Sequence, residues 1–270
     1  MSLGIVQGLW WPKLTTMEQL SVASYLRNGH TYHLYAYGEV AGLPDGALVK
    51  DANEILPESE VKRFPRIAQF ADYFRYKLLY ERGGWWTDMD VICLKPLDLE
   101  AEHVFSSEHN KDTQHTPSLN NVLIKSPVGS PIMAWALQQC REVNPTMIGY
   151  VALGPSLMNA AIAKFAVQNL VMPPEVFCPI PWWEWKKLVN EPAPQLPQNA
   201  YAIHLWHEMW RTIRLDTNAQ YPSGCLYEQM KRRFSIRSSS RRSARRPPFI
   251  YTSDKLAPVR KWWRMLRSLV

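Results

Sequence analysis

The sequence predicts an α/β fold on three observations. Strand-like and helix-like apolar stretches alternate from residue 5 to residue 167, a pattern typical of strands covered by helices. The chain has 270 residues, 46% of them hydrophobic and 12% aromatic, so it can bury the core of one large domain, with or without an appendage. A surface loop, "NEPAPQLPQ", and a low-complexity linker, "RSSSRRSARRPP", follow those stretches.

The first predicted elements are a buried strand over residues 5–11 and a helix over residues 17–26. In "TYHLYAYGEV", residues 31–40, aromatic and polar positions alternate. This alternation predicts a strand with Tyr35 and Tyr37 on one face.

A second helix is predicted to begin at Pro65 and to close at Gly83 and Gly84. Its apolar residues recur at helical spacing, at Ile67, Phe70, Ala71, Phe74 and Leu78. A strand over residues 91–94 follows. Further apolar pieces of alternating strand and helix character lie at residues 121–124, 132–140 and 155–167.

Two carboxylates stand two residues apart in "ERGGWWTDMDVICLKP", residues 81–96. Asp is a poor strand former, so local propensity does not explain Asp88 and Asp90. Residues i and i+2 of an extended chain point the same way, so both carboxylates can converge on one hard cation, which can also bind the oxygens of a diphosphate. Short Asp-x-Asp sequences are common, and the motif needs support from its surroundings.

Asp72 and Arg75 give that support, because they project from one face of the helix that leads into the aspartates. A solvated pair on that helix is the plain alternative and would contribute only a few tenths of a kcal/mol. The flanking residues are unusually apolar for a solvated pair: Phe70, Ala71, Tyr73, Phe74 and Tyr76. The pattern favours a carboxylate and a guanidinium fixed at a pocket wall, where they can grip sugar hydroxyls.

The net charge of +7 is a property of the C-terminal tail. Residues 231–270 hold 13 of the 31 Lys and Arg and one of the 24 acids, so they carry +12 and the rest of the chain −5. This asymmetry indicates a polyanionic partner, either nucleic acid or an anionic membrane. The body is net acidic and has no basic, aromatic-interleaved motif, so no nucleic-acid partner is expected.

An amphipathic helix is predicted over residues 251–270, after a basic linker over residues 235–250. Its apolar stripe consists of Val259, Trp262, Trp263, Leu266, Leu269 and Val270. The stripe suits the interface of an anionic membrane; packing against the body remains the alternative. No secretory leader or spanning segment is evident, so the expected location is cytoplasmic, peripheral on the inner face of the cytoplasmic membrane. The four cysteines form no CxxC pair and are expected to be reduced and buried.

"FADYFRYKLLYERGGWWTDMDVICLKPLD" resembles the core motif of the DxD-containing sugar-transfer glycosyltransferases. That family includes bacterial capsular and lipopolysaccharide enzymes, α-1,6-mannosyltransferases, α-1,4-galactosyltransferases and, more distantly, glucosylating clostridial toxins. The likeness extends upstream to "QGLWWPKL" and downstream to "PPEVFCPIPWWEWKKL" and "YAIHLWHEMWR", and covers roughly residues 4 to 234.

The resemblance implies a GT-A fold, a Rossmann-like nucleotide-diphospho-sugar transferase domain over residues 1–234. It implies that Asp90 ligates Mn²⁺ or Mg²⁺, with Asp88 at the donor and the outer shell of the metal. Asp72 and Arg75 would hold the hydroxyls of the donor sugar.

Five further residues carry an implied role. Trp10, or Trp11 beside it, would stack on the base, which the resemblance implies to be uracil, and Asn121 would border donor and acceptor. His204 and Trp206 would close over the diphosphate, with His204 also a candidate metal ligand; a histidine satisfied at the end of a buried strand is the alternative. Trp86 replaces a tyrosine of the toxin relatives, which puts a hydrogen bond there in doubt. His207 is expected at the surface.

The predicted function is that of a retaining glycosyltransferase. It would transfer a hexose from a UDP-sugar to a saccharide or glycolipid acceptor in the synthesis of bacterial capsule or lipopolysaccharide. With no obvious covalent nucleophile in the motif, front-face substitution is the expected route. The alternative is a catalytically silent module that binds a nucleotide sugar.

Overall fold

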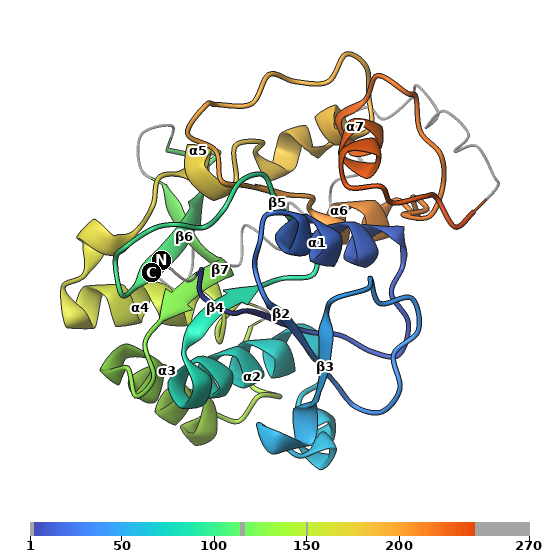
Figure 1. The fold of residues 1–270 in the computed structure, drawn as a ribbon. Coiled ribbons are helices and arrows are strands. Elements are labelled where there is room, and N and C mark those ends of the chain that lie inside the picture. Colours follow the sequence, from blue (N-terminus) through green and yellow to red (C-terminus); the bar gives the residue numbers. More distant parts are fainter. Residues whose placement is uncertain (1–2, 114–116, 150, 241–270) are drawn as a thin grey trace.

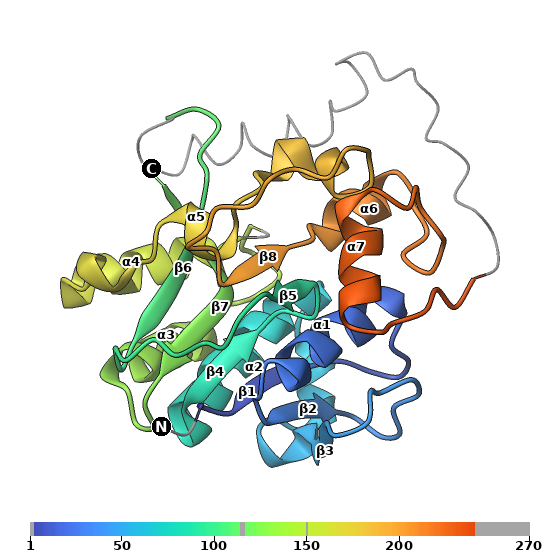
Figure 2. The same cartoon turned by 45° about the horizontal axis from the view of Figure 1, so that its top comes forward.

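The computed structural model describes residues 3–113, 117–149 and 151–240. The predicted helix over residues 251–270 and the linker from residue 241 onward lie outside the described residues. The described chain folds around one mixed sheet with helices on both faces (Figures 1 and 2).

The main sheet has six strands in the order β3-β2-β1-β4-β7-β6. Their bounds are β1 Val6–Leu9, β2 Tyr32–Ala36, β3 Leu48–Asp51, β4 Gly84–Thr87, β6 Val104–Glu108 and β7 Ser118–Ser126. Strands β3, β2, β1 and β4 run parallel to one another, β7 runs antiparallel to β4, and β6 runs antiparallel to β7. A separate two-stranded sheet pairs β5 (Val91–Cys93) with β8 (Ala202–His204).

The helices cover both faces of the main sheet. Their bounds are α1 Thr16–Arg27, α2 Ile67–Arg82, α3 Pro131–Glu142, α4 Pro155–Phe165, α5 Pro174–Phe177, α6 His207–Thr212 and α7 Leu226–Arg233. Short 3₁₀ helices are η1 Ala52–Glu54, η2 Glu58–Arg63, η3 Gln168–Leu170 and η4 Trp182–Leu188. In Figure 1, α2 and α3 lie on one side of the sheet, and α1 and α7 on the other.

Each face of the sheet has its own hydrophobic core. Because neighbouring residues of a strand point to opposite faces, Trp85 packs into the core shared with α1 and the C-terminal segments, and Trp86 into the core shared with α2, α3 and α4. Both indoles are buried. The packing of β4 in both cores therefore fixes the position of the segment that carries Asp88 and Asp90.

The predicted α/β class is confirmed, and the elements predicted around residues 5–11, 17–26, 31–40, 65–83, 121–124, 132–140 and 155–167 are present. Residues 84–87, for which no strand was predicted, form β4 in the middle of the sheet. All four cysteines are buried and free, as predicted. Among the residues described, no helix has the length and apolar character needed to cross a bilayer.

The turn from α2 into β4 needs its two glycines. Gly83 and Gly84 have φ angles of 61° and 84°, a region that favours glycine. A Cβ at Gly83 would lie 2.8 Å from the backbone nitrogen of Val128, and one at Gly84 would lie 2.9 Å from the carbonyl oxygen of Ile5. The close packing of this turn sends the chain from the end of α2 directly into the sheet.

Candidate active site

Asp88 and Asp90 lie in the turn that connects the two sheets, after the end of β4 and before β5. Met89, between them, points into the protein and is 6% exposed; its sulfur accepts a hydrogen bond of 3.2 Å from the hydroxyl of Tyr32. A Cβ at Gly8 would lie 2.9 Å from that sulfur. The inward Met89 leaves the two carboxylates on the outer side of the turn.

Arg75 joins Asp72 to Asp88. Its Nη1 donates to Oδ1 of Asp72 at 2.8 Å, and its Nη2 donates to Oδ1 of Asp88 at 2.7 Å. Its side chain is 4% exposed and that of Asp72 9%. The pair is therefore a buried part of the site, and the alternative of a solvated pair on α2 does not hold.

Trp86 contacts both Arg75 and Asp88. The guanidinium of Arg75 lies 4.8 Å from the centre of its ring, and its indole nitrogen donates to Oδ1 of Asp88 at 2.8 Å. The doubt about a hydrogen bond at this position is thus resolved, because an indole N–H donates where the toxin relatives have a hydroxyl. Burial raises the pKa of Asp88, although Arg75 opposes the rise.

Asn121 holds the carboxylate of Asp72. From β7, its Nδ2 donates to Oδ1 of Asp72 at 2.6 Å. Burial raises the pKa of Asp72 to about 6, with Arg75 opposing the rise. At Gly154, which precedes α4, a Cβ would lie 2.9 Å from Oδ2 of Asp72 and 3.0 Å from Nδ2 of Asn121. The backbone at Gly154 thus needs its glycine for a close approach to Asp72.

Asp90 is held from the opposite side by the end of β8 and the start of α6. Nε2 of His204 lies 3.1 Å from Oδ2 of Asp90, and the backbone nitrogen of His207 donates to the same oxygen at 2.9 Å. Burial opposes ionisation of Asp90, yet His204 beside it lowers the pKa of Asp90 to about 2. Burial likewise opposes protonation of His204, but Asp90 raises the pKa of His204 well above its ordinary value.

His204 ends the buried strand β8, but it is not the satisfied histidine of the alternative, because its Nδ1 has no hydrogen-bond partner within the described residues. Trp206 packs on it, with ring centroids 3.9 Å apart, and donates from its indole nitrogen to the carbonyl oxygen of Ile180 at 2.8 Å. His207 was expected at the surface, but it is half-buried and belongs to the site. Its ring lies 6.4 Å from that of Trp10, and its Nδ1 lies 3.9 Å from the fully buried Glu18.

The two adjacent tryptophans after β1 diverge. Trp10 lies beside His207, on the Asp90 side of the turn, and donates from its indole nitrogen to the carbonyl oxygen of Lys13 at 3.0 Å. Trp11 packs edge-on against Tyr37, with ring centroids 4.9 Å apart. Both are half-buried. Of the two, Trp10 is the one next to a residue that contacts the DxD motif.

The carboxylates of Asp72, Asp88 and Asp90 share one feature: each accepts its hydrogen bonds through only one of its two oxygens. Within the described residues, no hydrogen bond reaches Oδ2 of Asp72, Oδ2 of Asp88 or Oδ1 of Asp90. The side chains of Asp88 and Asp90 are 28% and 14% exposed. Each aspartate of the motif can therefore offer one unbonded oxygen, the donor atom that Mg²⁺ and Mn²⁺ prefer.

His204 does not add a third ligand in this arrangement, because its Nε2 faces Asp90 and its Nδ1 is buried. Across residues 3–113, 117–149 and 151–240, no group of three or more His, Cys, Asp or Glu side chains is arranged to hold a metal ion. The donor set that fits a cation is thus the aspartate pair, with room for ligands from a bound diphosphate.

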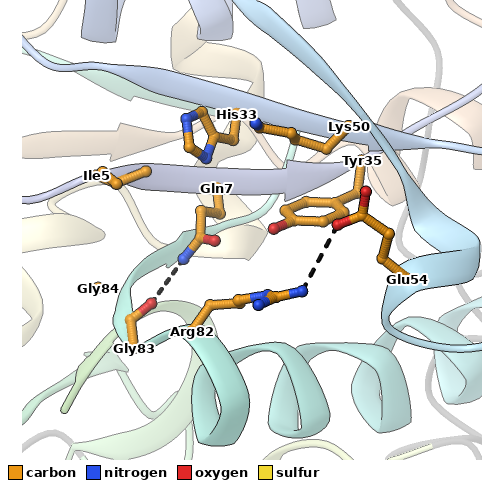
Figure 3. Close-up of a pocket in the computed structure, with 9 residues that line it drawn as sticks. All are labelled: Ile5, Gln7, His33, Tyr35, Lys50, Glu54, Arg82, Gly83 and Gly84. Atoms are coloured by element: carbon orange, nitrogen blue, oxygen red, sulfur yellow. Dashed lines mark hydrogen bonds and ion pairs between the residues drawn. The ribbon is translucent and has the colours of Figure 1, made fainter. Parts of the chain in front are cut away.

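A pocket of about 370 Å³ lies elsewhere, near the start of β4 and the last turn of α2 (Figure 3). Its lining consists of Ile5, Gln7, His33, Tyr35, Lys50, Glu54, Arg82, Gly83 and Gly84. None of the candidate site residues lines it. Asp88 follows the opposite end of β4, so this pocket is separate from the DxD site.

Two family descriptions match this chain. One, a glycosyltransferase sugar-binding region containing a DXD motif, matches residues 30–114, and the other, an alpha 1,4-glycosyltransferase conserved region, matches residues 129–241. The first match includes Asp72, Arg75, Asp88 and Asp90, and the second includes His204. Each match covers less than half of the chain, which is therefore similar over these two regions to glycosyltransferases that contain a DXD motif.

Several curated relatives are similar over part of the chain. The lactosylceramide 4-alpha-galactosyltransferases of Mus musculus and Homo sapiens are 26% identical over 166 residues, which cover 56% of this chain and 44% of each relative. The matched region thus spans less than half the length of these relatives. The initiation-specific alpha-1,6-mannosyltransferase of Candida albicans is 44% identical over 50 residues, 18% of this chain and 11% of that protein.

Solved structures are similar at low sequence identity. The PaToxG glycosyltransferase aligns with a TM-score of 0.46 and 15% identity, covering 60% of this chain and 69% of that chain.

Proposed function

We propose that this protein transfers a hexose from a nucleotide sugar to a hydroxyl of a saccharide or glycolipid. The observation that carries the proposal is Arg75, which bridges Asp72 and the first aspartate of the DxD motif inside the protein. Because the guanidinium fixes both carboxylates, their free oxygens are pre-oriented for a ligand. Similarity to two glycosyltransferase families, each over part of the chain, supports the assignment.

In this proposal, Asp88 and Asp90 hold Mn²⁺ or Mg²⁺ through their unbonded oxygens. When bound, such a cation supplies Lewis-acid stabilisation of the departing diphosphate. His204 acts as a positioning residue, because it holds Asp90 through the other oxygen. Asp72, through Oδ2, accepts hydrogen bonds from the hydroxyls of the donor sugar, and Arg75 keeps that carboxylate in place. Trp10 is the candidate to stack on the base, with uracil as the proposed base.

Retention of anomeric configuration is part of the proposal. The carboxylates of the site are engaged by Arg75, Trp86, Asn121 and His204, which leaves them suited to binding and electrostatics more than to covalent attack. Front-face attack by the acceptor hydroxyl is therefore the proposed route. Product of inverted configuration, seen by NMR, or a trapped glycosyl-enzyme adduct would contradict it.

The proposed acceptor is a saccharide or glycolipid at a membrane surface, since the basic tail suits an anionic leaflet. Two relatives are named for lactosylceramide, a glycolipid. A role in bacterial capsule or lipopolysaccharide synthesis, and a location on the inner face of the cytoplasmic membrane, remain predictions from the sequence.

A vesicle experiment tests the tail. Ser239 donates from its backbone nitrogen to Oγ1 of Thr16 at 3.2 Å, and Lys231 donates to Oγ of Ser238 at 2.7 Å, so residues 238–239 contact the catalytic body. A truncation should therefore begin at residue 241. The full chain should sediment with anionic vesicles, less so as salt rises, and the truncated chain should not; equal sedimentation of both would contradict the membrane role.

The alternative is a catalytically silent module that binds a nucleotide sugar. Thermal-shift screening of UDP-hexoses with Mn²⁺ identifies the donor, because a ligand that binds only the folded state raises the melting temperature. Release of UDP and transfer of the hexose are then measured with the best donor, with and without a chelator. Stabilisation without any metal-dependent turnover would favour the silent module.

A further inference from the structure

The end of β6 lies beside the segment around α5, next to the DxD site. The backbone nitrogen of Met172 donates to the carbonyl oxygen of Phe105 at 2.8 Å, and Oγ of Ser107 donates to the carbonyl oxygen of Met172 at 2.6 Å. Figures 1 and 2 both show α5 against the end of β6. Two segments far apart in sequence thus form one wall, and each brings side chains that the donor site does not use.

Glu108, the last residue of β6, brings a carboxylate to this wall. Its Oε2 accepts a hydrogen bond of 3.4 Å from Nδ2 of Asn120, and that nitrogen also lies 3.2 Å from the sulfur of Cys178. Within the described residues, no hydrogen bond reaches Oε1 of Glu108. The carboxylate is half-buried, held by one oxygen and available through the other.

A series of contacts connects Glu108 to the second aspartate of the motif. Nδ2 of Asn120 contacts both Glu108 and Cys178. Two residues after Cys178, the carbonyl oxygen of Ile180 accepts the indole hydrogen bond of Trp206. Trp206 packs on His204, whose Nε2 lies 3.1 Å from Asp90. Burial raises the pKa of Glu108 to about 7.

An aromatic side chain stands near the same wall. Trp182, half-buried at the start of η4, lies two residues after Ile180, whose carbonyl oxygen accepts the indole hydrogen bond of Trp206. Nζ of Lys111, three residues after Glu108, lies 5.6 Å from the centre of the Trp182 ring. The segment after β6 therefore has the Glu108 carboxylate at its start and the Trp182 indole beside Lys111.

We propose that Glu108 and Trp182 form the subsite for the acceptor saccharide, with the carboxylate accepting hydrogen bonds from pyranose hydroxyls and the indole packing on the face of the ring. The proposal rests on the proposed glycosyltransferase function. A partly exposed carboxylate and an amphipathic indole on the same wall suit a sugar, which offers hydroxyl groups at its edge and C–H groups on its face. The position beyond His204 and Asp90 is where an acceptor must enter once the donor diphosphate occupies the aspartates.

Two variants and two matched controls test this subsite. Glu108→Gln removes the charge at nearly constant shape, and Trp182→Ala removes the ring. Trp135 is a matched control, since it is also a half-buried indole, with Nζ of Lys164 5.9 Å from its ring centre. Glu142, exposed on α3, is the control for the carboxylate.

The measurement is saturation-transfer NMR of methyl β-galactoside, methyl β-glucoside and methyl β-lactoside with the full chain, in the presence of UDP and Mn²⁺. We expect the wild-type protein to bind at least one of them, and Glu108→Gln and Trp182→Ala to weaken that binding tenfold or more with UDP affinity unchanged. Trp135→Ala and Glu142→Gln should bind like the wild type.

The outcomes separate the two proposals. If the wild-type protein binds UDP but none of the pyranosides, or if both site variants bind the saccharide like the controls, the acceptor subsite is wrong and the glycosyltransferase function stands. If the wild-type protein does not bind UDP with Mn²⁺ at all, the proposed function itself fails, and the subsite fails with it.

Discussion

Nε2 of His204 lies 3.1 Å from Oδ2 of Asp90, so the end of the small sheet holds the second aspartate of the motif. Strand β8 places this histidine opposite Val91 of β5, one residue after Asp90. The register of the two strands therefore fixes the histidine and the aspartate relative to each other. A side chain 114 positions away along the sequence sets the orientation of the DxD carboxylate.

Replacement of His204 should weaken metal binding without removing it. In His204→Ala, the backbone nitrogen of His207 still donates to Asp90, but the carboxylate loses its second anchor. Because partners that orient a metal-binding carboxylate contribute about 10- to 100-fold in affinity, we expect a loss of that order. Titration with Mn²⁺ followed by electron paramagnetic resonance measures it. An unchanged affinity would show that His204 is only a structural residue of β8.

Gly154 should be essential for the geometry of Asp72. In Gly154→Ala, the new methyl group would lie 2.9 Å from Oδ2 of Asp72, so either the loop or the carboxylate must move. We expect a loss of about 1–3 kcal/mol in the free energy of unfolding and a fall in turnover.

Gly149 is the matched control in the same loop, since no atom of the described residues beyond its chain neighbours lies within 4 Å of a Cβ built there. The free energy of unfolding in urea and the steady-state turnover of both variants test the packing role of Gly154. Equal behaviour of Gly154→Ala and Gly149→Ala would refute the packing role of Gly154.

The titration of Glu108 predicts how stability depends on pH. Burial raises the pKa of this carboxyl from 4.5 to about 7, so the folded protein keeps the proton between these values while the unfolded chain loses it. The unfolding free energy of the wild type should therefore fall, relative to that of Glu108→Gln, as pH rises from about 4.5 to 7. Urea unfolding of both proteins across this window tests the sign. A difference that grows with pH would mean that the carboxylate is stabilised in its charged form.

The fold was predictable wherever periodicity was strong. The apolar spacing of α2 and the glycines that end it predicted that helix, although it begins at Ile67 and not at Pro65. Strand β4 was missed because its four residues are a glycine, two tryptophans and a threonine, a stretch too short to show alternation. The tertiary packing of Trp85 and Trp86 on opposite faces is what makes it a strand.

The link between Asp72, Arg75 and the DxD motif was predictable because Asp72, Arg75, Asp88 and Asp90 fall within 19 consecutive residues of one motif. The pairing of β5 with β8 is a long-range contact that no local pattern reveals, so the role of His207 was missed. Glu108 carried no signal either, because a single glutamate before a polar loop is common. The apolar flanks of "HLWHEMW" were the one hint that His207 does not lie freely at the surface.

We propose that the unbonded oxygens of Asp88 and Asp90 hold a divalent cation for sugar transfer. Metal-dependent release of UDP from the best UDP-hexose, measured with the wild type, Asp90→Asn and the control Glu142→Gln, tests this role directly. A neutral amide is a poor ligand for a hard cation, so Asp90→Asn should lose at least 100-fold in turnover, about 2.7 kcal/mol of transition-state stabilisation, while keeping its melting temperature within a few degrees. Substantial turnover by Asp90→Asn, or turnover by the wild type that survives complete removal of divalent metal, would contradict the metal-binding role of the two aspartates.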